Sequence, residues 1–156
     1  LSAMPYSASS TSYESASAVQ KVNLLGFLQT QNGLQTELLE KAGNLSGGQC
    51  QRLVIARALL RSDSAVYIFD EAASNIDVES EELIMNVIHE LAKTKTVLLI
   101  SHRLANVVQS DQIYFLKNGT ICERGTHAEL MEQNGAYCHL YDSQMVLENY
   151  GKEGNA

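Results

Sequence analysis

The chain has 156 residues, which is the size of one domain with a small addition, and a chain of this length can bury a core without disulfide bonds. Its 18 acidic residues outnumber its 11 basic ones, so the net charge is −7. This charge argues against a protein that coats nucleic acid without sequence specificity, because such a protein needs a basic surface. The longest dense apolar run, residues 96–100, is far shorter than the ~20 residues that span a bilayer. We therefore expect neither a membrane-spanning helix nor, from the opening residues, a secretory signal.

The first part of the chain divides at a change in composition. Residues 1–17 are rich in Ser and Ala without an apolar period, and they predict a flexible lead-in or a cloning remnant. A helix is expected to begin near Ala18, because apolar residues then recur at three-residue steps (Val19, Val22, Leu25 and Leu28). Residues 18–147 are expected to form the folded part, and residues 148–156 a flexible tail.

The middle of the chain alternates helices and strands. Ser46 and Gln49 form an S-x-x-Q capping box, which predicts a helix running to about Leu60. Ala65–Phe69 and Thr96–Ile100 are short apolar runs that predict buried strands, and the amphipathic segment Val78–Ala92 between them predicts a helix. Buried strands that alternate with helices are typical of a parallel α/β sheet.

The last third predicts a hairpin and two helices. Two strand-like runs flank Lys117-Asn118-Gly119, a turn signal, and this hairpin is expected as an antiparallel addition near the edge of the sheet. Thr126 and Glu129 form a second capping box, and a final helix is expected over about residues 135–147. The three cysteines have long gaps and no C-x-x-C spacing, so we expect neither a disulfide framework nor a zinc site, and a reducing cytosolic setting fits best.

One candidate binding segment is Leu45-Ser46-Gly47-Gly48-Gln49. Adjacent glycines let the backbone approach a ligand, and the following helix directs its first N–H groups and its positive dipole end to the same place. This arrangement suits a phosphate, with the Ser46 hydroxyl and the Gln49 amide as further donors. The same residues are also what a simply capped helix start requires, so the pentapeptide alone leaves both interpretations open.

Two strand ends carry candidate catalytic residues. The run that begins at Ala65 leads into Asp70 and Glu71, and ligands of open α/β sheets gather at the carboxyl ends of strands. Asp70 could hold Mg²⁺ through oxygen, and Glu71 could polarise a water that attacks phosphorus. His102 follows the second strand and could hydrogen-bond a terminal phosphate. We interpret the other histidines, His89, His127 and His139, as structural or surface residues.

The order of these motifs, within fewer than 60 residues, resembles the ATP-binding domain of ABC transporters. Leu45–Gln49 resembles the ABC signature motif, Val66–Glu71 the Walker B strand with its catalytic carboxylate, Ser74–Asp77 the D-loop, and His102 the switch histidine. The resemblance covers about residues 18–147. It implies the later part of a P-loop NTPase (RecA-like) α/β core with parallel strands and a remnant of the ABC helical subdomain.

The resemblance also assigns roles and partners. It implies that Glu71 and His102 are catalytic, that Asp70 binds Mg²⁺, and that ATP contacts the signature residues together with Ser74 and Asp77. The partners would be a second, head-to-tail ATP-binding domain and a membrane-spanning domain at the cytoplasmic face of the cell membrane, with no nucleic acid.

The segments Ser101–Leu104 and Asn118–His127 resemble exporter-type domains. Cys50 and Ala73 differ from the residues common in the family, at positions that do not carry the chemistry directly.

The phosphate cradle G-x-x-x-x-G-K-[ST] does not occur in these 156 residues. The chain therefore resembles the C-terminal part of an ABC ATPase, and we expect it to be inactive by itself, because the P-loop amides and lysine hold the phosphates. Two other hypotheses remain. One is the ATPase head of a chromosome-maintenance or DNA-repair protein, although no sustained heptads occur. The other is a non-catalytic interaction module.

Overall fold

In the computed structural model, the described residues are 8–40 and 43–153, and they form two compact units that divide between Leu98 and Leu99. Each unit is built separately around its own helices and strands. The first contains these elements: α1 (Ala8–Lys21), α2 (Leu25–Gln29), the 3₁₀ helix η1 (Gly33–Gln35), α3 (Gly47–Leu59), β1 (Val66–Asp70) and α4 (Val78–Ala92). Strand β2 (Thr96–Ile100) begins in this unit.

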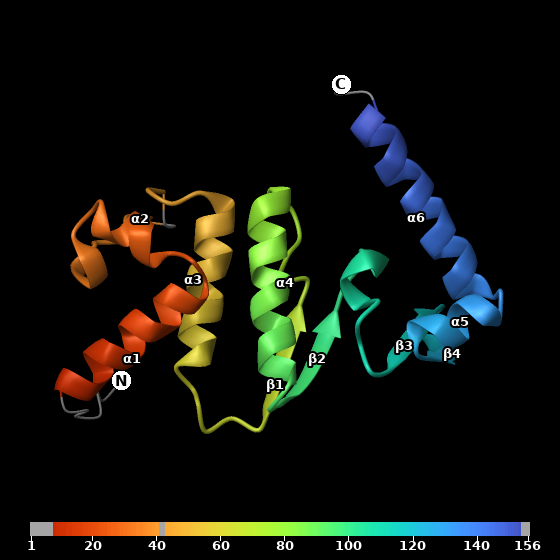
Figure 1. The fold of residues 1–156 in the computed structure, drawn as a ribbon, viewed down its shortest axis with the longest axis horizontal. Helices are drawn as coiled ribbons and strands as arrows, with labels where there is room; N and C mark the ends of the chain where they lie inside the picture. Colours follow the sequence, from red (N-terminus) through yellow and green to blue (C-terminus); the bar gives the residue numbers. More distant parts are fainter. Residues whose placement is uncertain (1–7, 41–42, 154–156) are drawn as a thin grey trace. The chain divides into compact units, whose positions relative to one another are not determined.

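A β-α-β crossover organises the first unit. Strands β1 and β2 pair in parallel as a two-stranded sheet, and α4, which joins them, lies over one face of the pair (Figure 1). The Thr96 N–H donates to the Ala65 carbonyl at the start of this pairing (3.1 Å). Helix α3 lies beside α4 on one side and packs against α1 on the other. The α/β fold with parallel strands is thus confirmed.

The core of the first unit is formed where these helices meet. The buried apolar residues of α1 and α2 are Ala18, Val19 and Leu28, with Val22 and Leu24 between the two helices; those of α3, α4 and β1 are Ile55, Ala56, Ile84, Met85, Ile88, Tyr67 and Phe69. Helix α3 packs against both α1 and α4 and buries Ile55 and Ala56, whereas Val54 and the C-cap residue Leu60 are exposed.

The second unit contains the 3₁₀ helix η3 (Leu104–Val107), the strands β3 (Ile113–Lys117) and β4 (Thr120–Gly125), and the helices α5 (His127–Glu132) and α6 (Ala136–Glu153). The hairpin is confirmed: Ile113 pairs with Gly125 and Lys117 with Thr120, with an irregularity after Phe115. Asn118 and Gly119 both have positive φ, which a tight two-residue hairpin turn requires. The core of the second unit consists of Leu104, Val107, Ile113, Leu130 and Tyr137.

Several element boundaries and burial patterns differ from the predictions. Helix α1 begins at Ala8, ten residues before the expected start, and α6 continues to Glu153, beyond the expected end. The spacing of apolar residues marks only the part of a helix that packs in the core, and the helix can extend beyond that part. Residues 1–7 and 154–156 of the predicted lead-in and tail lie outside the described residues.

The predicted strands also differ in their surroundings. They were expected to be buried on both faces, but Ile68 of β1 and Leu98 of β2 are exposed, and β1 buries only alternate residues. The described part of the chain covers one face of this pair with α4. The hairpin was expected at the edge of the parallel sheet, whereas β3 and β4 form a two-stranded sheet of their own, which the tight turn closes locally. Among the described residues, no helix has both the length and the apolar composition to cross a bilayer.

Candidate functional site

The predicted signature segment forms the start of α3. Ser46 is the N-cap with extended backbone, and its Oγ accepts the Gln49 N–H (3.2 Å), while Gln49 Oε1 accepts the Ser46 N–H (2.9 Å). The capping box is therefore formed as predicted. The N–H groups of Gly47 and Gly48, in the first turn of α3, have no carbonyl one turn earlier to bind. This geometry is compatible with both interpretations of the pentapeptide. The Ser46 cap fixes the start of the helix, and the first-turn amides still form the kind of site that binds anions.

The two glycines of this segment have different surroundings. A Cβ at Gly47 would have no neighbouring atom within 4 Å, so this position is open to an approaching ligand. A Cβ at Gly48 would lie 2.8 Å from Ser80 Cβ and 3.2 Å from Asp77 Oδ2. Gly48 is required because α4 packs directly against α3 here. The prediction that both glycines serve close ligand approach is therefore supported by the geometry only at Gly47.

The end of the predicted D-loop is the N-cap of α4. Asp77 Oδ1 accepts the Ser80 N–H (2.8 Å), and this hydrogen bond, together with that of the Ser80 side chain, holds the pKa of the Asp77 carboxyl below its ordinary value. The positive charge of Arg52 contributes in the same direction. Asp77 thus has a structural role next to Gly48, and its assignment as an ATP contact stays a prediction.

The predicted acidic residues lie at the carboxyl end of β1, and both are exposed. Glu71 adopts a left-handed backbone conformation (φ 49°), which costs a non-glycine residue about 1 kcal/mol or more and is concentrated at functional sites. The Glu71 carbonyl accepts the Ser74 N–H (3.0 Å), so a tight turn connects the acidic pair to the D-loop. The turn directs the chain from the sheet edge toward the start of α4.

Gln51 was not predicted as a site residue, yet it connects the signature helix with the D-loop. Its Nε2 donates to the Ser74 carbonyl (3.2 Å) across 23 residues of sequence. Its Oε1 is buried, and no hydrogen-bond partner for it is found among the residues that the structure describes. Two hydrogen bonds in series, Gln51 to Ser74 and Ser74 to Glu71, therefore join α3 to the turn that carries Glu71. Spacing along the sequence gives no signal for such a contact.

His102 belongs to the second unit, where it is exposed in the segment that follows β2. The neighbouring Ser101 Oγ accepts the Arg103 N–H and donates to the Arg103 carbonyl, both at 3.1 Å. The segment is thus held in a defined conformation close to the strand end. The structure brings the signature segment and the D-loop together in the first unit, and it places His102 in the second.

The residues present fit a nucleotide phosphate and Mg²⁺ in a specific way. The open position at Gly47, at the positive end of the 13-residue helix α3, suits a phosphate oxygen. Among the described residues there is no group of three or more His, Cys, Asp or Glu side chains that could enclose a metal. Mg²⁺ in phosphoryl-transfer sites needs only one or two carboxylates, because phosphate oxygens and water complete its shell. A single exposed carboxylate such as Asp70 fits that use.

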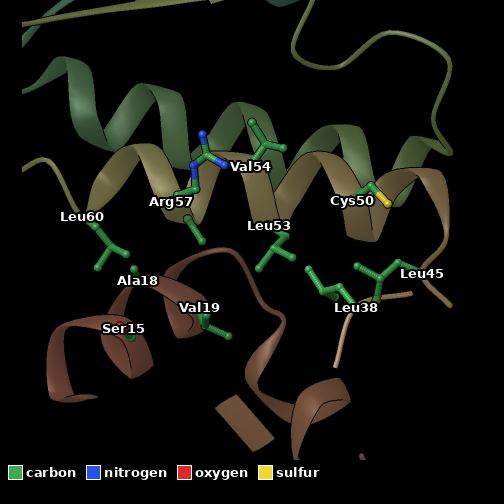
Figure 2. A pocket seen from close by; sticks show the side chains of 11 residues that line it. Ser15, Ala18, Val19, Leu38, Leu45, Cys50, Leu53, Val54, Arg57 and Leu60 are labelled. Carbon is green, nitrogen blue, oxygen red and sulfur yellow. The ribbon is translucent and has the colours of Figure 1, made fainter. Parts of the chain in front are cut away.

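An apolar pocket of about 440 Å³ lies between α1, α3 and the segment before the signature (Figure 2). Leu53 of α3 and Leu60, directly after α3, point toward Ala18 and Val19 of α1. Leu38 and Leu45 line the end of the pocket near Cys50. Its lining is mostly aliphatic, which does not suit a triphosphate. The pocket therefore does not suit the phosphate-binding role that is predicted for the start of α3.

The remaining histidine and cysteine predictions concern structure. His127 Nδ1 lies 2.9 Å from the Tyr137 hydroxyl, and its ring contacts Tyr141, so His127 packs within the second unit. Cys50, Cys122 and Cys138 are free thiols. Burial raises the pKa of the Cys138 thiol, and Asp142 adds to this effect, which makes Cys138 a poor nucleophile.

The comparisons with known proteins agree with the order of motifs. Residues 6–74 match the family described as ABC transporter. The chain is 50% identical over 138 residues to an uncharacterized ABC transporter ATP-binding protein of Haemophilus influenzae, and 48% identical over 128 residues to an ATP-dependent lipid A-core flippase of Mannheimia succiniciproducens. These matches cover 88% and 81% of this chain, but only 24% and 22% of the relatives, so the chain spans about a quarter of their length.

A solved structure gives the same result. A bacterial Atm1-family ABC exporter with ATP bound superimposes with a TM-score of 0.76 at 32% identity, covering 85% of this chain and 23% of that one. The match includes the predicted P-loop NTPase architecture. The relatives described here are named as transporters, which does not favour the chromosome-maintenance alternative.

Proposed function

Because the chain belongs to the ATP-binding domains of ABC transporters, we propose that it supplies the signature motif and the Walker B carboxylates of an ATPase that drives export across a membrane. The observation that carries this proposal is the connection within the first unit. The open, capped start of α3 is joined through Gln51 and Ser74 to the turn at Glu71. The signature half of one composite site and the Walker B half of the other would thus be carried by one continuous piece of structure.

Each residue has a role in this proposal. The first-turn amides of α3 and the Ser46 hydroxyl bind phosphate oxygens, with Gly47 allowing close approach. Asp70 holds Mg²⁺, which neutralises charge on the phosphates when bound. Glu71 accepts a proton from the attacking water, and His102 hydrogen-bonds the terminal phosphate. Ser74 and Asp77, in the D-loop between the acidic pair and α4, are assigned to ATP contact.

The partners follow from the chemistry that these residues require. The sequence G-x-x-x-x-G-K-[ST], whose backbone and lysine cradle the β- and γ-phosphates, does not occur in the 156 residues. We place the α3 N-terminus against ATP held by the P-loop of a second ATP-binding domain in a head-to-tail dimer. The resulting assembly would work with a membrane-spanning domain at the cytoplasmic face, as the exporter and flippase names of similar proteins suggest.

Substitution of Glu71 tests the proposal in a full-length transporter that contains this chain. We expect Glu71→Gln to lower the rate of ATP hydrolysis by roughly 10²- to 10⁴-fold while ATP binding persists, because the amide keeps the shape but cannot accept the proton. Glu82→Gln, at an exposed carboxyl of α4, is the matched control and should hydrolyse ATP normally. If the Glu71→Gln transporter hydrolysed ATP at the normal rate, Glu71 would not be the residue that accepts the proton.

The chain alone provides a second test. Without a phosphate cradle, we expect no measurable ATPase activity from the 156 residues and only weak binding of MgATP. Isothermal titration calorimetry measures this directly. Saturable binding in the millimolar range or tighter would contradict the composite arrangement and favour a site complete within this chain.

A further inference from the structure

The segment that carries His102 is held from two sides by side chains. Ser101 Oγ binds both the N–H and the carbonyl of Arg103, as described above. On the other side, Gln144 of α6 accepts the Leu104 N–H through Oε1 (2.9 Å) and donates from Nε2 to the His102 carbonyl (2.8 Å). One amide side chain thus satisfies a backbone donor and a backbone acceptor on either side of Arg103, from 40 and 42 residues away.

We propose that Gln144 is a positioning residue that sets the backbone of the His102 segment and thereby the placement of the imidazole. This inference deepens the proposed function and rests on the role of His102 in it. Gln144 does not touch the nucleotide in this proposal. It acts through the two peptide groups that flank Arg103, and its effect reaches the reaction only through His102.

The surroundings of Gln144 support a fixed geometry. Helix α6 packs against η3, which begins at Leu104, and Leu104 is buried in the core of the second unit together with Tyr137 of α6. The apolar contact holds α6 next to the segment, and the amide of Gln144 then fixes its polar backbone groups. A donor and an acceptor on one planar group define the orientation of a peptide segment more tightly than a single hydrogen bond does.

The substitution Gln144→Met removes both hydrogen bonds with little change in side-chain length. In a full-length transporter, we expect kcat for ATP hydrolysis to fall about 10- to 100-fold, since a misplacement of about 1 Å can cost this much, while KM for ATP changes less than about twofold. Gln144→Glu keeps the acceptor for Leu104 but cannot donate to His102, and its kcat should lie between Gln144→Met and the parent. Ser143→Ala is the matched control, because the Ser143 hydroxyl donates only within α6, to His139.

The decisive measurement is a double-mutant cycle with His102→Ala. If Gln144 acts through His102, Gln144→Met should lower kcat in the parent but cause no further loss in the His102→Ala background. An equal fold loss in both backgrounds would show a general structural role and overturn the proposal. The proposal would also be overturned if the Gln144→Met transporter kept a parent-like kcat while the His102→Ala transporter was slow.

The cycle also separates this inference from the proposed function. A His102→Ala transporter with parent-like kcat would overturn the role of His102, and with it the Gln144 proposal. If Gln144→Met does not fold, the Gln144→Glu transporter is measured in its place. The proposal is overturned if Gln144→Glu has a parent-like kcat. It is also overturned if Gln144→Glu lowers kcat by the same factor in the His102→Ala background as in the parent. Hydrogen exchange provides a readout besides activity, and we expect faster exchange at residues 102–104 in Gln144→Met but not in Ser143→Ala.

Discussion

Gly48→Ala tests the packing of α3 against α4 most directly. An added Cβ would lie 2.8 Å from Ser80 Cβ and 3.2 Å from Asp77 Oδ2, and closer still to Ser80 Oγ. Carbon atoms pack optimally at about 3.5–4.0 Å, so one of the two helices must move. Overpacking of this kind costs about 1–3 kcal/mol, and the better helix propensity of Ala offsets at most about 1 kcal/mol. We expect a net loss of about 1–2 kcal/mol.

Gly47→Ala is the matched control at the adjacent position. A Cβ there would meet no atom within 4 Å, so the substitution should leave stability unchanged or raise it by up to about 1 kcal/mol. In a domain of this size, 1 kcal/mol corresponds to about 2–4 °C in melting temperature. Thermal unfolding followed by circular dichroism should therefore show Gly48→Ala about 2–8 °C below the parent chain, with Gly47→Ala at or slightly above it.

The comparison has two refuting results. If Gly48→Ala melts at or above the parent, or if both alanines lower the melting temperature equally, then the contact with Ser80 does not set the requirement for glycine. Removal of the obstructing side chain gives an internal check: Gly48→Ala should cost less in a Ser80→Gly background than in the parent. In a full-length transporter, Gly47→Ala should instead impair ATP hydrolysis, because its methyl group enters the space assigned to the phosphate.

Two further predictions concern caps. Glu123 accepts the N–H groups of Ala136 (2.6 Å) and Tyr137 (3.0 Å) at the start of α6, so Glu123→Ala should cost about 1–2 kcal/mol in thermal unfolding, and Glu123→Gln, which keeps an acceptor, should cost less. The capping carboxyls Asp77 and Glu129 have pKa values held below their ordinary values of 3.8 and 4.5, chiefly by hydrogen bonds from Ser80 and Thr126. The stability that they contribute is present above those ordinary values and is lost as the pH falls through the lowered ones. The melting temperature should therefore fall less steeply below about pH 4 in Asp77→Asn and Glu129→Gln than in the parent or Glu82→Gln, and equal slopes would contradict this assignment.

Local signals predicted much of this fold. The two capping boxes mark the starts of α3 and α5, and both form with their reciprocal hydrogen bonds. The turn at Asn118 and Gly119 fixes the hairpin. These features succeed because the residues that interact are three or fewer positions apart, so the sequence itself contains the whole interaction.

Features that depend on distant partners could not be predicted in this way. The start of α1 at Ala8 is one example, since its Ser-rich first half has no apolar period, and the helix extends back from Ala18 and Val19, which pack in the core. The exposed residues of β1 are another, because a run of apolar residues does not state which face is covered. Gln51 and Gln144 were missed for the same reason, as their partners are 23 and at least 40 residues away.

The arrangement around Gln51 explains why the signature and the acidic pair need to be considered together. Gly48 packs α3 onto the start of α4, and three residues later Gln51 binds the Ser74 carbonyl in the turn between β1 and α4. Both ends of the D-loop are therefore held by α3. The left-handed backbone at Glu71 and the buried Gln51 Oε1, which has no partner within the described part of the chain, lie at opposite ends of this connection, and both carry an energetic cost. Such costs persist only where the surrounding contacts enforce them, so α3 fixes the position of the Glu71 turn as well as the place where phosphate would bind.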